Sequence, residues 1–193
     1  MKPRPGLVLA STSAYRRALL QRLGLEFSVA DPAVAEERRA GEAPHDMAKR
    51  LAEAKARAVA GRFPDGLIIG SDQVAECGDE ILGKPMMHDN AVRQLRALSG
   101  REAVFHTAVC VHSARATAVR VVPCRVLFRK LGDALIERYL AKEKPYDCAG
   151  SAKSEGLGIA LIEKMESEDP TAIIGLPLIA LVDLLREQGF DVL

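Results

Sequence analysis

The chain has 193 residues, enough for one α/β domain or for two small lobes with a hydrophobic core. Lysine and arginine total 27 against 26 aspartates and glutamates, so the net charge is only +1. Proteins that bind nucleic acid usually carry a basic excess on one face, so we do not expect nucleic acid as a partner. The four cysteines form no CxxC pair, which favours reduced thiols in a cytoplasmic protein. The apolar run at residues 7–10 is too short for a signal peptide or a membrane span, so no membrane partner is expected.

Predicted strands alternate with predicted helices along the chain. In order, we expect a strand at 7–10, a helix at 14–23, a strand at 26–30, a helix at 44–62, a strand at 67–70, a helix at 89–99, strands at 103–113 and 117–128, a helix at 133–142, a strand at 159–163 and a last helix that begins at Pro177. This alternation indicates an α/β fold. No repeat, low-complexity tract or linker interrupts the chain, so we expect a single domain over residues 1–193.

The first predicted helix carries a cation inside its apolar face. Leu19, Leu20 and Leu23 share one face of this helix, and Arg16 falls in the middle of that face. Arg16 also lies in the first turn, where the helix macrodipole disfavours positive charge. A charge in this position indicates an anion that offsets it, and the alternative is that the side chain snorkels past the helix end.

The second predicted helix repeats this pattern. Met47, Leu51, Ala54 and Ala58 form its apolar stripe, and Lys55 lies within the apolar arc. An ammonium group in that position must reach water by snorkelling or must meet a carboxylate or a phosphate. Lys55 is therefore a candidate anion-binding residue.

Asp72 follows the apolar strand predicted at 67–70. A strand that is apolar throughout is typical of a buried parallel strand, and open α/β sheets bind ligands beyond the carboxyl ends of their strands. We therefore expect Asp72 at the end of this strand as a candidate catalytic carboxylate, with a turn or helix-cap aspartate as the alternative. The first strand ends in the same way at Ser11, ahead of a helix N-terminus that offers free N–H groups to an anion.

Two further charged groups have solvated surface as their simpler explanation. Glu36 and Glu37 form an acidic pair followed by two arginines, although paired carboxylates also recruit Mg²⁺. Lys84 lies in a Gly-Lys-Pro turn.

The sequence has no P-loop and no GxGxxG, GxSxG or HExxH motif, which argues against serine hydrolases and zinc peptidases. Cations on apolar helix faces, together with carboxylates after strands, fit phosphate chemistry best.

The chain resembles the Maf family along nearly its whole length. The segments that carry the resemblance follow one another in the same order as in the family, and they are residues 9–17, the loop at Glu36, and residues 51–56, 69–73, 83–85, 146–151, 155–156 and 174–177. The resemblance implies an elongated, inosine-triphosphatase-like α/β fold, with a mixed sheet, flanking helices and two lobes around a central cleft.

The same resemblance implies a nucleoside triphosphate pyrophosphatase, which cuts between the α- and β-phosphates and releases a monophosphate and pyrophosphate. Asp72 matches the family's proton acceptor. Five further residues match its polar cleft positions: Ser11, Arg16, Glu36, Lys55 and Lys84. The implied cofactor is a divalent cation, Mg²⁺ or alternatively Mn²⁺, with Glu36 and Asp72 as its ligands. Ala35 departs from the pattern, since related sequences often carry Asp there, and this leaves the metal ligands open. Family members are often dimers, so a homodimer is expected.

Three positions distinguish the branches of the family, and here they are Tyr15, Gln73 and Glu155. The branch that acts on dTTP and UTP typically carries Arg, Thr and Gln, whereas an aromatic residue, Gln and Glu resemble the 7-methyl-GTP branch. Methylation at N7 makes guanine cationic, so Tyr15 can hold the ring by cation–π stacking. Glu155 can accept hydrogen bonds from the guanine N1–H and exocyclic amine.

The resemblance thus implies hydrolysis of 7-methyl-GTP to 7-methyl-GMP and diphosphate, which removes a modified nucleotide before it enters nucleic acid. Two alternatives stay open. One is the same chemistry on dTTP or UTP. The other is a nucleotide-binding regulator of cell division with no meaningful turnover, because the family name has been tied to septum formation.

Overall fold

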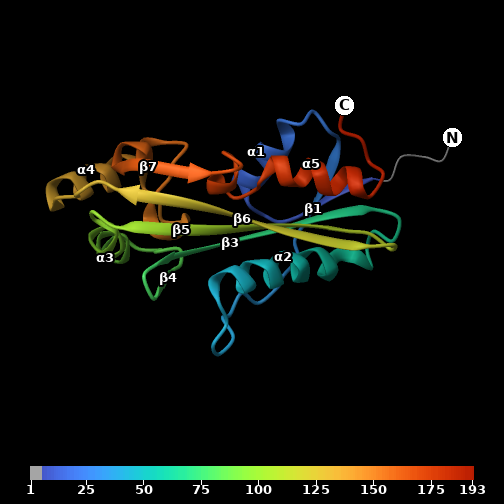
Figure 1. Ribbon diagram of the computed structural model, residues 1–193, viewed down its shortest axis with the longest axis horizontal. Coiled ribbons are helices and arrows are strands. Elements are labelled where there is room, and N and C mark those ends of the chain that lie inside the picture. Colours follow the sequence, from blue (N-terminus) through green and yellow to red (C-terminus); the bar gives the residue numbers. More distant parts are fainter. Residues whose placement is uncertain (1–5) are drawn as a thin grey trace. The chain divides into compact units, whose positions relative to one another are not determined.

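The computed structural model describes residues 6–193, and Figure 1 labels its elements. Residues 1–5, which precede the apolar run at 7–10, lie outside the described residues. The strands are β1 (Leu7–Ala10), β2 (Phe27–Ala30), β3 (Leu67–Cys77), β4 (Glu80–Leu82), β5 (Glu102–His112), β6 (Thr117–Phe128) and β7 (Ile162–Ser167). The helices are α1 (Ala14–Gln21), α2 (Pro44–Ala60), α3 (His88–Leu98), α4 (Asp133–Glu143) and α5 (Leu178–Glu187), with short 3₁₀ helices η1 (Ala149–Ser151), η2 (Leu157–Leu161) and η3 (Ala172–Ile174). None of the helices within residues 6–193 combines the length and the apolar character that a membrane span requires.

The strands form a mixed sheet in the order β2-β1-β3-β5-β6-β7, with β4 paired to β3. β1 runs parallel to both β2 and β3, whereas β4 is antiparallel to β3 and β7 is antiparallel to β6. The parallel strands are joined through α1 and α2, as parallel pairing requires a crossover. The predicted mixed α/β fold with flanking helices is confirmed.

Two predicted strands have different bounds in the structure. β3 was expected to end at residue 70, but it continues to Cys77, because the polar residues after Gly70 are followed by further strand residues that pair with β4. The strand predicted at 159–163 begins later than expected, since residues Leu157–Leu161 form η2 and β7 begins at Ile162. β7 is mostly exposed and polar, so its sequence lacks the apolar run on which the prediction depended.

The chain divides into two compact units. The first contains the described residues up to Asp72 together with Thr107–Val122 and Asp169–Leu193, and the second contains Gln73–His106 and Pro123–Glu168. β3, β5 and β6 each contribute residues to both units. Each unit is described separately below.

In the first unit, side chains on β1 and β3 alternate between two helical layers. The odd-numbered residues at the start of these strands join a buried apolar cluster with α1 and α5, and they are Leu7 and Leu9 of β1 and Leu67 and Ile69 of β3. Figure 1 shows α1 and α5 on one side of the strands and α2 on the other. The even-numbered residues of β3, starting with Ile68, therefore face α2.

Gly70 lets α2 pack directly onto β3. A Cβ atom at this position would lie 2.1 Å from the carbonyl oxygen of Ala52 and 2.8 Å from the amide nitrogen of Ala56, both on α2. Any larger residue would push the helix away from the strand. Two residues further on, Asp72 lies on the same face of β3 as Gly70, toward the helix that carries Lys55.

The close approach of α2 also changes its buried face from the predicted stripe. Leu51 is buried as predicted, but Ala58 is exposed and Ala54 is only half-buried. Ala52, on the predicted flank of this stripe, and Ala56 are fully buried. Ala52 and Ala56 are the residues that meet Gly70, because only small side chains fit at this close approach.

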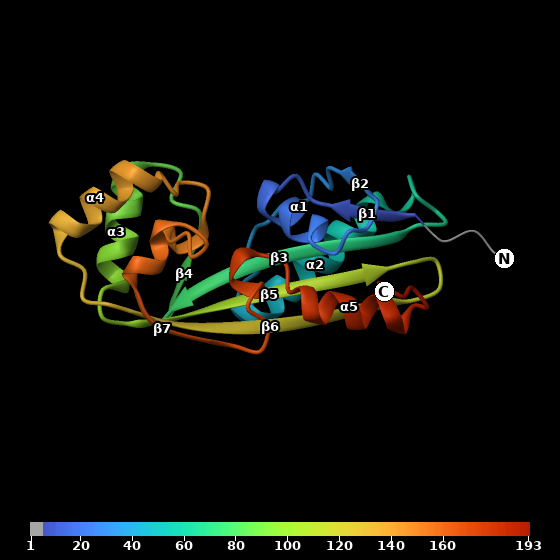
Figure 2. The ribbon, with the colours of Figure 1, turned by 90° about the horizontal axis from the view of Figure 1, so that it is seen from above.

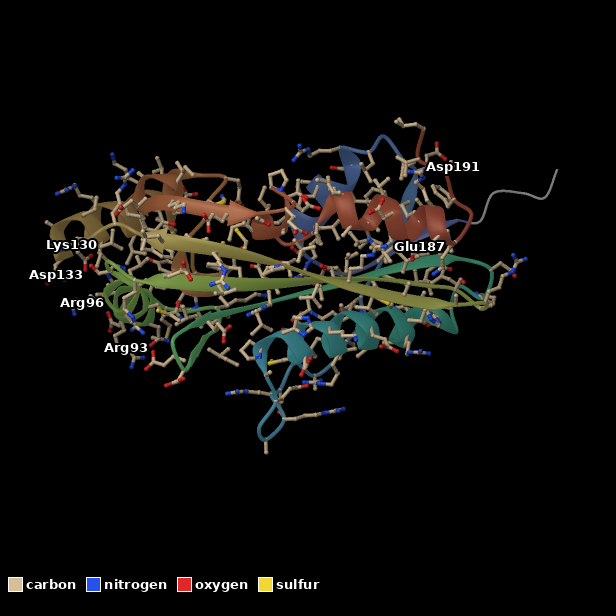
Figure 3. The ribbon with its side chains drawn as sticks, viewed as in Figure 1. Arg93, Arg96, Lys130, Asp133, Glu187 and Asp191 are labelled. Carbon is tan, nitrogen blue, oxygen red and sulfur yellow. The ribbon has the colours of Figure 1, made fainter. Side chains whose placement is uncertain are left out.

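In the second unit, α3 and α4 lie side by side, as Figure 2 shows. Arg96 of α3 pairs with Asp133 at the start of α4, with 2.8 Å between Nε and Oδ1, and Figure 3 labels both residues. η1 packs against α3, and η2 packs against α4. These helices support the irregular segments that carry Lys84 and Glu155.

Candidate functional site

Asp72 lies inside β3 rather than at its end, which corrects the expected position. The neighbouring strand β1 does end here, because its last residue, Ala10, pairs with Gly70. Asp72 therefore lies just past the carboxyl end of β1, although its own strand continues. This is the edge at which the general rule for open α/β sheets expects ligands. Its side chain is buried, with the residue only 5% exposed.

Lys55 joins two carboxylates. Its Nζ lies 2.6 Å from Oδ1 of Asp72 and 2.5 Å from Oε1 of Glu36. Lys55 is itself buried, whereas the side chain of Glu36 is about half exposed. Of the two alternatives for this lysine, the structure therefore favours an anionic partner over snorkelling into water.

The pKa of the Asp72 carboxyl group is raised from its ordinary value. Burial is the largest cause, because it disfavours the charged carboxylate, and the positive charges of Lys55 and Arg16 offset part of the effect. A carboxylate with a raised pKa is a stronger base than an exposed aspartate. Asp72 thus has both the burial and the charged neighbours typical of a group that accepts a proton.

Arg16 is half-buried near the start of α1. Ser13 caps this helix, and its hydroxyl accepts a hydrogen bond from the Arg16 backbone N–H at 3.4 Å. The guanidinium donates from Nε to the carbonyl oxygen of Gly175 at 2.8 Å and from Nη1 to the hydroxyl of Ser11 at 3.4 Å. The pKa of Arg16 is lowered from its ordinary value, because burial disfavours the charged guanidinium. The nearby carboxylates of Asp72 and Glu36 offset part of this effect.

Two residues beside this group were missed by the sequence reasoning. Ser71 is fully buried, and its hydroxyl donates to the carbonyl oxygen of Gly175 at 2.9 Å. The same carbonyl accepts from Arg16, so Gly175 joins β3 to the start of α1. Ser71 directly follows the apolar run at 67–70, and both residues lie in segments that carry the family resemblance, 69–73 and 174–177.

A clamp around Arg50, also missed, fixes the loop that carries Glu36. Arg50 on α2 binds both carboxylate oxygens of Glu42, with Nε–Oε1 and Nη2–Oε2 distances of 2.5 and 2.8 Å. Its Nη2 also donates to the carbonyl oxygen of Glu37 at 3.0 Å. The hydrogen bond from Arg50 lowers the pKa of Glu42 to about 2. The loop is thus attached at Glu37, the residue after Glu36, to the helix that also carries Lys55.

The carboxylates of Glu36 and Asp72 suit a divalent cation. Both approach one ammonium group, so their oxygens converge on a site of positive charge. Within residues 6–193, no group of three His, Cys, Asp or Glu side chains could hold a metal ion by itself. Mg²⁺ commonly binds through one or two carboxylates and the phosphates of its substrate, so this pair fits such a cation.

The three remaining candidates in the second unit lie on different segments. Gln73 is half-buried in β3, directly after Asp72. Lys84 is exposed in a loop fixed by α3, because the Gly83 carbonyl accepts from Gln94 at 2.9 Å. Glu155 is exposed in a turn that follows η1. Tyr15, the third base-reading candidate, belongs to the first unit and is half-buried on α1.

The candidate residues are divided between the two units. The first unit brings together Ser11, Arg16, Glu36, Lys55 and Asp72, whereas Gln73, Lys84 and Glu155 belong to the second unit. A large groove in the first unit lies at the opposite, amino end of β1 and β3, where it is lined by segments around Phe63, Ser113 and Gln188. It contains none of the candidate residues.

Known proteins resemble this chain over nearly its full length. The family described as Maf-like protein matches residues 6–188. A protein named 7-methyl-GTP pyrophosphatase from Methylobacillus flagellatus is 58% identical over 191 residues, which cover 98% of this chain and 100% of the relative. A protein of the same name from Nitrosospira multiformis is 55% identical, over 96% of this chain and 95% of the relative. Another from Cupriavidus pinatubonensis is 54% identical, over 97% of this chain and 96% of the relative. On this similarity, together with the fold and the cluster of polar residues at the carboxyl end of β1, the chain belongs to the Maf family.

Proposed function

We propose that the chain is a nucleoside triphosphate pyrophosphatase that hydrolyses 7-methyl-GTP to 7-methyl-GMP and diphosphate. The observation that carries the proposal is the buried contact of Asp72 with Lys55. It lies in a chain of which 98% matches the relative named 7-methyl-GTP pyrophosphatase from Methylobacillus flagellatus. Residues 1–193 act as a single catalytic domain of the Maf type.

Asp72 acts as the general base. Its carboxylate accepts a proton from a water molecule, and the water oxygen attacks the α-phosphorus. The bond from this phosphorus to the oxygen that bridges to the β-phosphate then breaks, and pyrophosphate leaves. The raised pKa of Asp72 supports this role, because an aspartate at its usual pKa of about 3.9 is a weak base at neutral pH.

Positive groups bind the triphosphate and stabilise the leaving pyrophosphate. Arg16 and Lys55 lie beside Asp72 and carry the charges that developing phosphate anions require. Ser11 and the N-terminus of α1, where the helix macrodipole is positive, are further anion-binding groups. Lys84 is assigned the same role from the family pattern.

A divalent cation, Mg²⁺ or alternatively Mn²⁺, is the proposed cofactor. When bound, such a cation neutralises charge on the phosphate oxygens. Glu36 and Asp72 would hold it. Because position 35 is alanine, the loop offers the carboxylate of Glu36 without an acidic neighbour before it.

Base recognition is assigned to Tyr15, Gln73 and Glu155. The aromatic ring of Tyr15 suits a cationic methylated guanine, with a cation–π contribution of about 0.5–2 kcal/mol. The Glu155 carboxylate suits the two N–H donors of guanine, whereas thymine and uracil present an acceptor–donor–acceptor edge. We further propose a cytoplasmic location and a homodimer.

Release of pyrophosphate from a panel of nucleoside triphosphates tests the function. We expect 7-methyl-GTP to be hydrolysed with the highest kcat/KM and to yield the monophosphate. A strong preference for UTP or dTTP would overturn the choice of substrate. An absence of turnover with every nucleotide, in protein that still binds nucleotide, would instead favour a regulator of cell division.

A further inference from the structure

The turn that carries Glu155 is held at both ends by one side chain, Glu143 at the end of α4. Oε2 of Glu143 accepts a hydrogen bond from the backbone N–H of Leu157 at 2.7 Å. Oε1 of the same carboxylate lies 3.2 Å from Nζ of Lys153. Glu155 is the central residue between these two contacts, so a single carboxylate brackets it.

The Glu143 carboxylate is well placed to keep its charge in this contact. Its side chain is only 12% exposed. The hydrogen bond from the Leu157 N–H is the main cause of a lowered Glu143 pKa, and Lys153 contributes in the same direction. Because the carboxylate stays ionised at neutral pH, both contacts with the turn are charge-assisted.

The turn has a second attachment to α4 and a tight contact with Glu143. The backbone N–H of Lys153 donates to the hydroxyl of the buried Tyr139 at 3.0 Å. A Cβ atom at Gly156 would lie 2.7 Å from Oε2 of Glu143, so the carboxylate packs directly onto the backbone beside Glu155. These contacts fix the direction in which the turn presents the exposed Glu155 side chain.

We infer that Glu143 is a positioning residue that sets the base selectivity of the enzyme through Glu155. The inference rests on the proposed reading of guanine by Glu155. Two parallel hydrogen bonds to a base require an orientation held within about 10–20°. A turn released from α4 would present the carboxylate in many orientations, and the advantage of the methylated guanine over a pyrimidine would fall.

The test compares Glu143→Ala, Glu143→Gln and Gly156→Ala with the parent protein. The quantity measured is the ratio of kcat/KM for 7-methyl-GTP to kcat/KM for UTP. We expect Glu143→Ala to lower this ratio about tenfold while kcat for UTP changes by less than about twofold. Glu143→Gln retains an acceptor for the Leu157 N–H, so its loss should be smaller. Gly156→Ala should act in the same direction as Glu143→Ala, because the added methyl group displaces the carboxylate.

The matched control is Glu137→Ala, which removes a carboxylate from the same helix. Glu137 pairs with His88, at 3.0 Å between Oε2 and Nε2, and its contact is with α3 rather than with the turn. This variant should keep the parental ratio. Calorimetric titration with 7-methyl-GMP and with UMP gives the same comparison without turnover, and Glu143→Ala should weaken only the binding of 7-methyl-GMP.

A double-mutant cycle with Glu155→Gln separates positioning from general stability. If Glu143 acts through Glu155, then Glu143→Ala should lower the ratio little further once Glu155 is changed. An unchanged ratio in all three variants, an equal loss on both substrates, or a fully additive double variant would overturn the inference. A parent protein with no preference for 7-methyl-GTP would instead overturn the proposed function itself. If Glu143→Ala fails to fold, Glu143→Gln and Gly156→Ala decide the question.

Discussion

The Nζ atom of Lys55 lies between Oδ1 of Asp72 and Oε1 of Glu36, so one buried ammonium group connects a helix, a strand and a loop. The contact depends on Gly70, which lets α2 pack closely against β3. Gly70 lies two residues before Asp72, on the same face of the strand. Position and charge at the site are thus fixed by the same packing.

Lys55→Met should shift the acidic limb of the pH–rate profile to higher pH. Lys55 is the strongest of the charges that lower the Asp72 pKa, so its removal raises that pKa further. More Asp72 is then protonated at a given pH, and kcat/KM falls. The rate of pyrophosphate release between pH 5 and about 9 measures the shift. Lys49→Met, an exposed change on the same helix, should leave the limb in place. A parental limb in Lys55→Met would show that Lys55 does not tune the base.

Glu42→Gln should destabilise the protein at neutral pH and not at very low pH. The folded pKa of Glu42 is about 2, below its ordinary value of 4.5, mainly because of the hydrogen bond from Arg50. A lowered folded pKa stabilises the protein above the unfolded pKa, and this stability is lost as the pH falls through about 2. Urea unfolding at pH 7 and at lower pH values measures the difference between variant and parent. Glu37→Gln is the control, because Glu37 contacts Arg50 through its backbone carbonyl. A difference that stays constant with pH would contradict the role of the clamp.

Tyr15→Arg combined with Glu155→Gln should move substrate preference toward UTP and dTTP. The new arginine no longer offers an aromatic face to a cationic ring, and glutamine matches the edge of a pyrimidine better than a carboxylate does. Steady-state kinetics on 7-methyl-GTP, UTP and dTTP measure the change, which we expect to exceed about tenfold in the ratio of kcat/KM. The single variants show how much each residue contributes. Unaltered selectivity in the double variant would remove both residues from base recognition.

Removal of divalent cations with EDTA should abolish turnover, and added Mg²⁺ should restore it. Glu36→Gln should raise the Mg²⁺ concentration needed for half-maximal rate, because one of the two proposed carboxylate ligands loses its charge. Binding of Mn²⁺ followed by electron paramagnetic resonance in the presence of 7-methyl-GMP gives an independent measure. Full activity in EDTA would remove the metal from the reaction.

Much of this fold could be predicted from local patterns. The apolar run at residues 67–70 and the capped helix after Ser13 are short-range signals, and the structure contains both. The misplaced cation at position 55 was also visible, because helical periodicity alone puts it among apolar residues. What periodicity could not supply was its partner, since Asp72 meets Lys55 through the packing of α2 on Gly70.

The errors arose where tertiary pairing decides the outcome. The polar residues after Gly70 resemble a strand end, but pairing with β4 carries β3 through to Cys77. In the same way, the sequence gives Arg50 no feature that distinguishes it from an ordinary exposed helix residue. Its role depends on Glu42, in the loop before α2, whose carboxylate it binds. Contacts of this kind join residues whose spacing in the sequence carries no periodic signal.

The most direct test of the account is the rate of 7-methyl-GTP hydrolysis by Asp72→Asn. Asparagine keeps the size of the side chain and can still accept a hydrogen bond from Lys55, but it cannot take a proton from water. We predict a folded protein whose kcat is about 10²–10⁴-fold below that of the parent. An Asp72→Asn protein as active as the parent would contradict the assignment of Asp72 as the base.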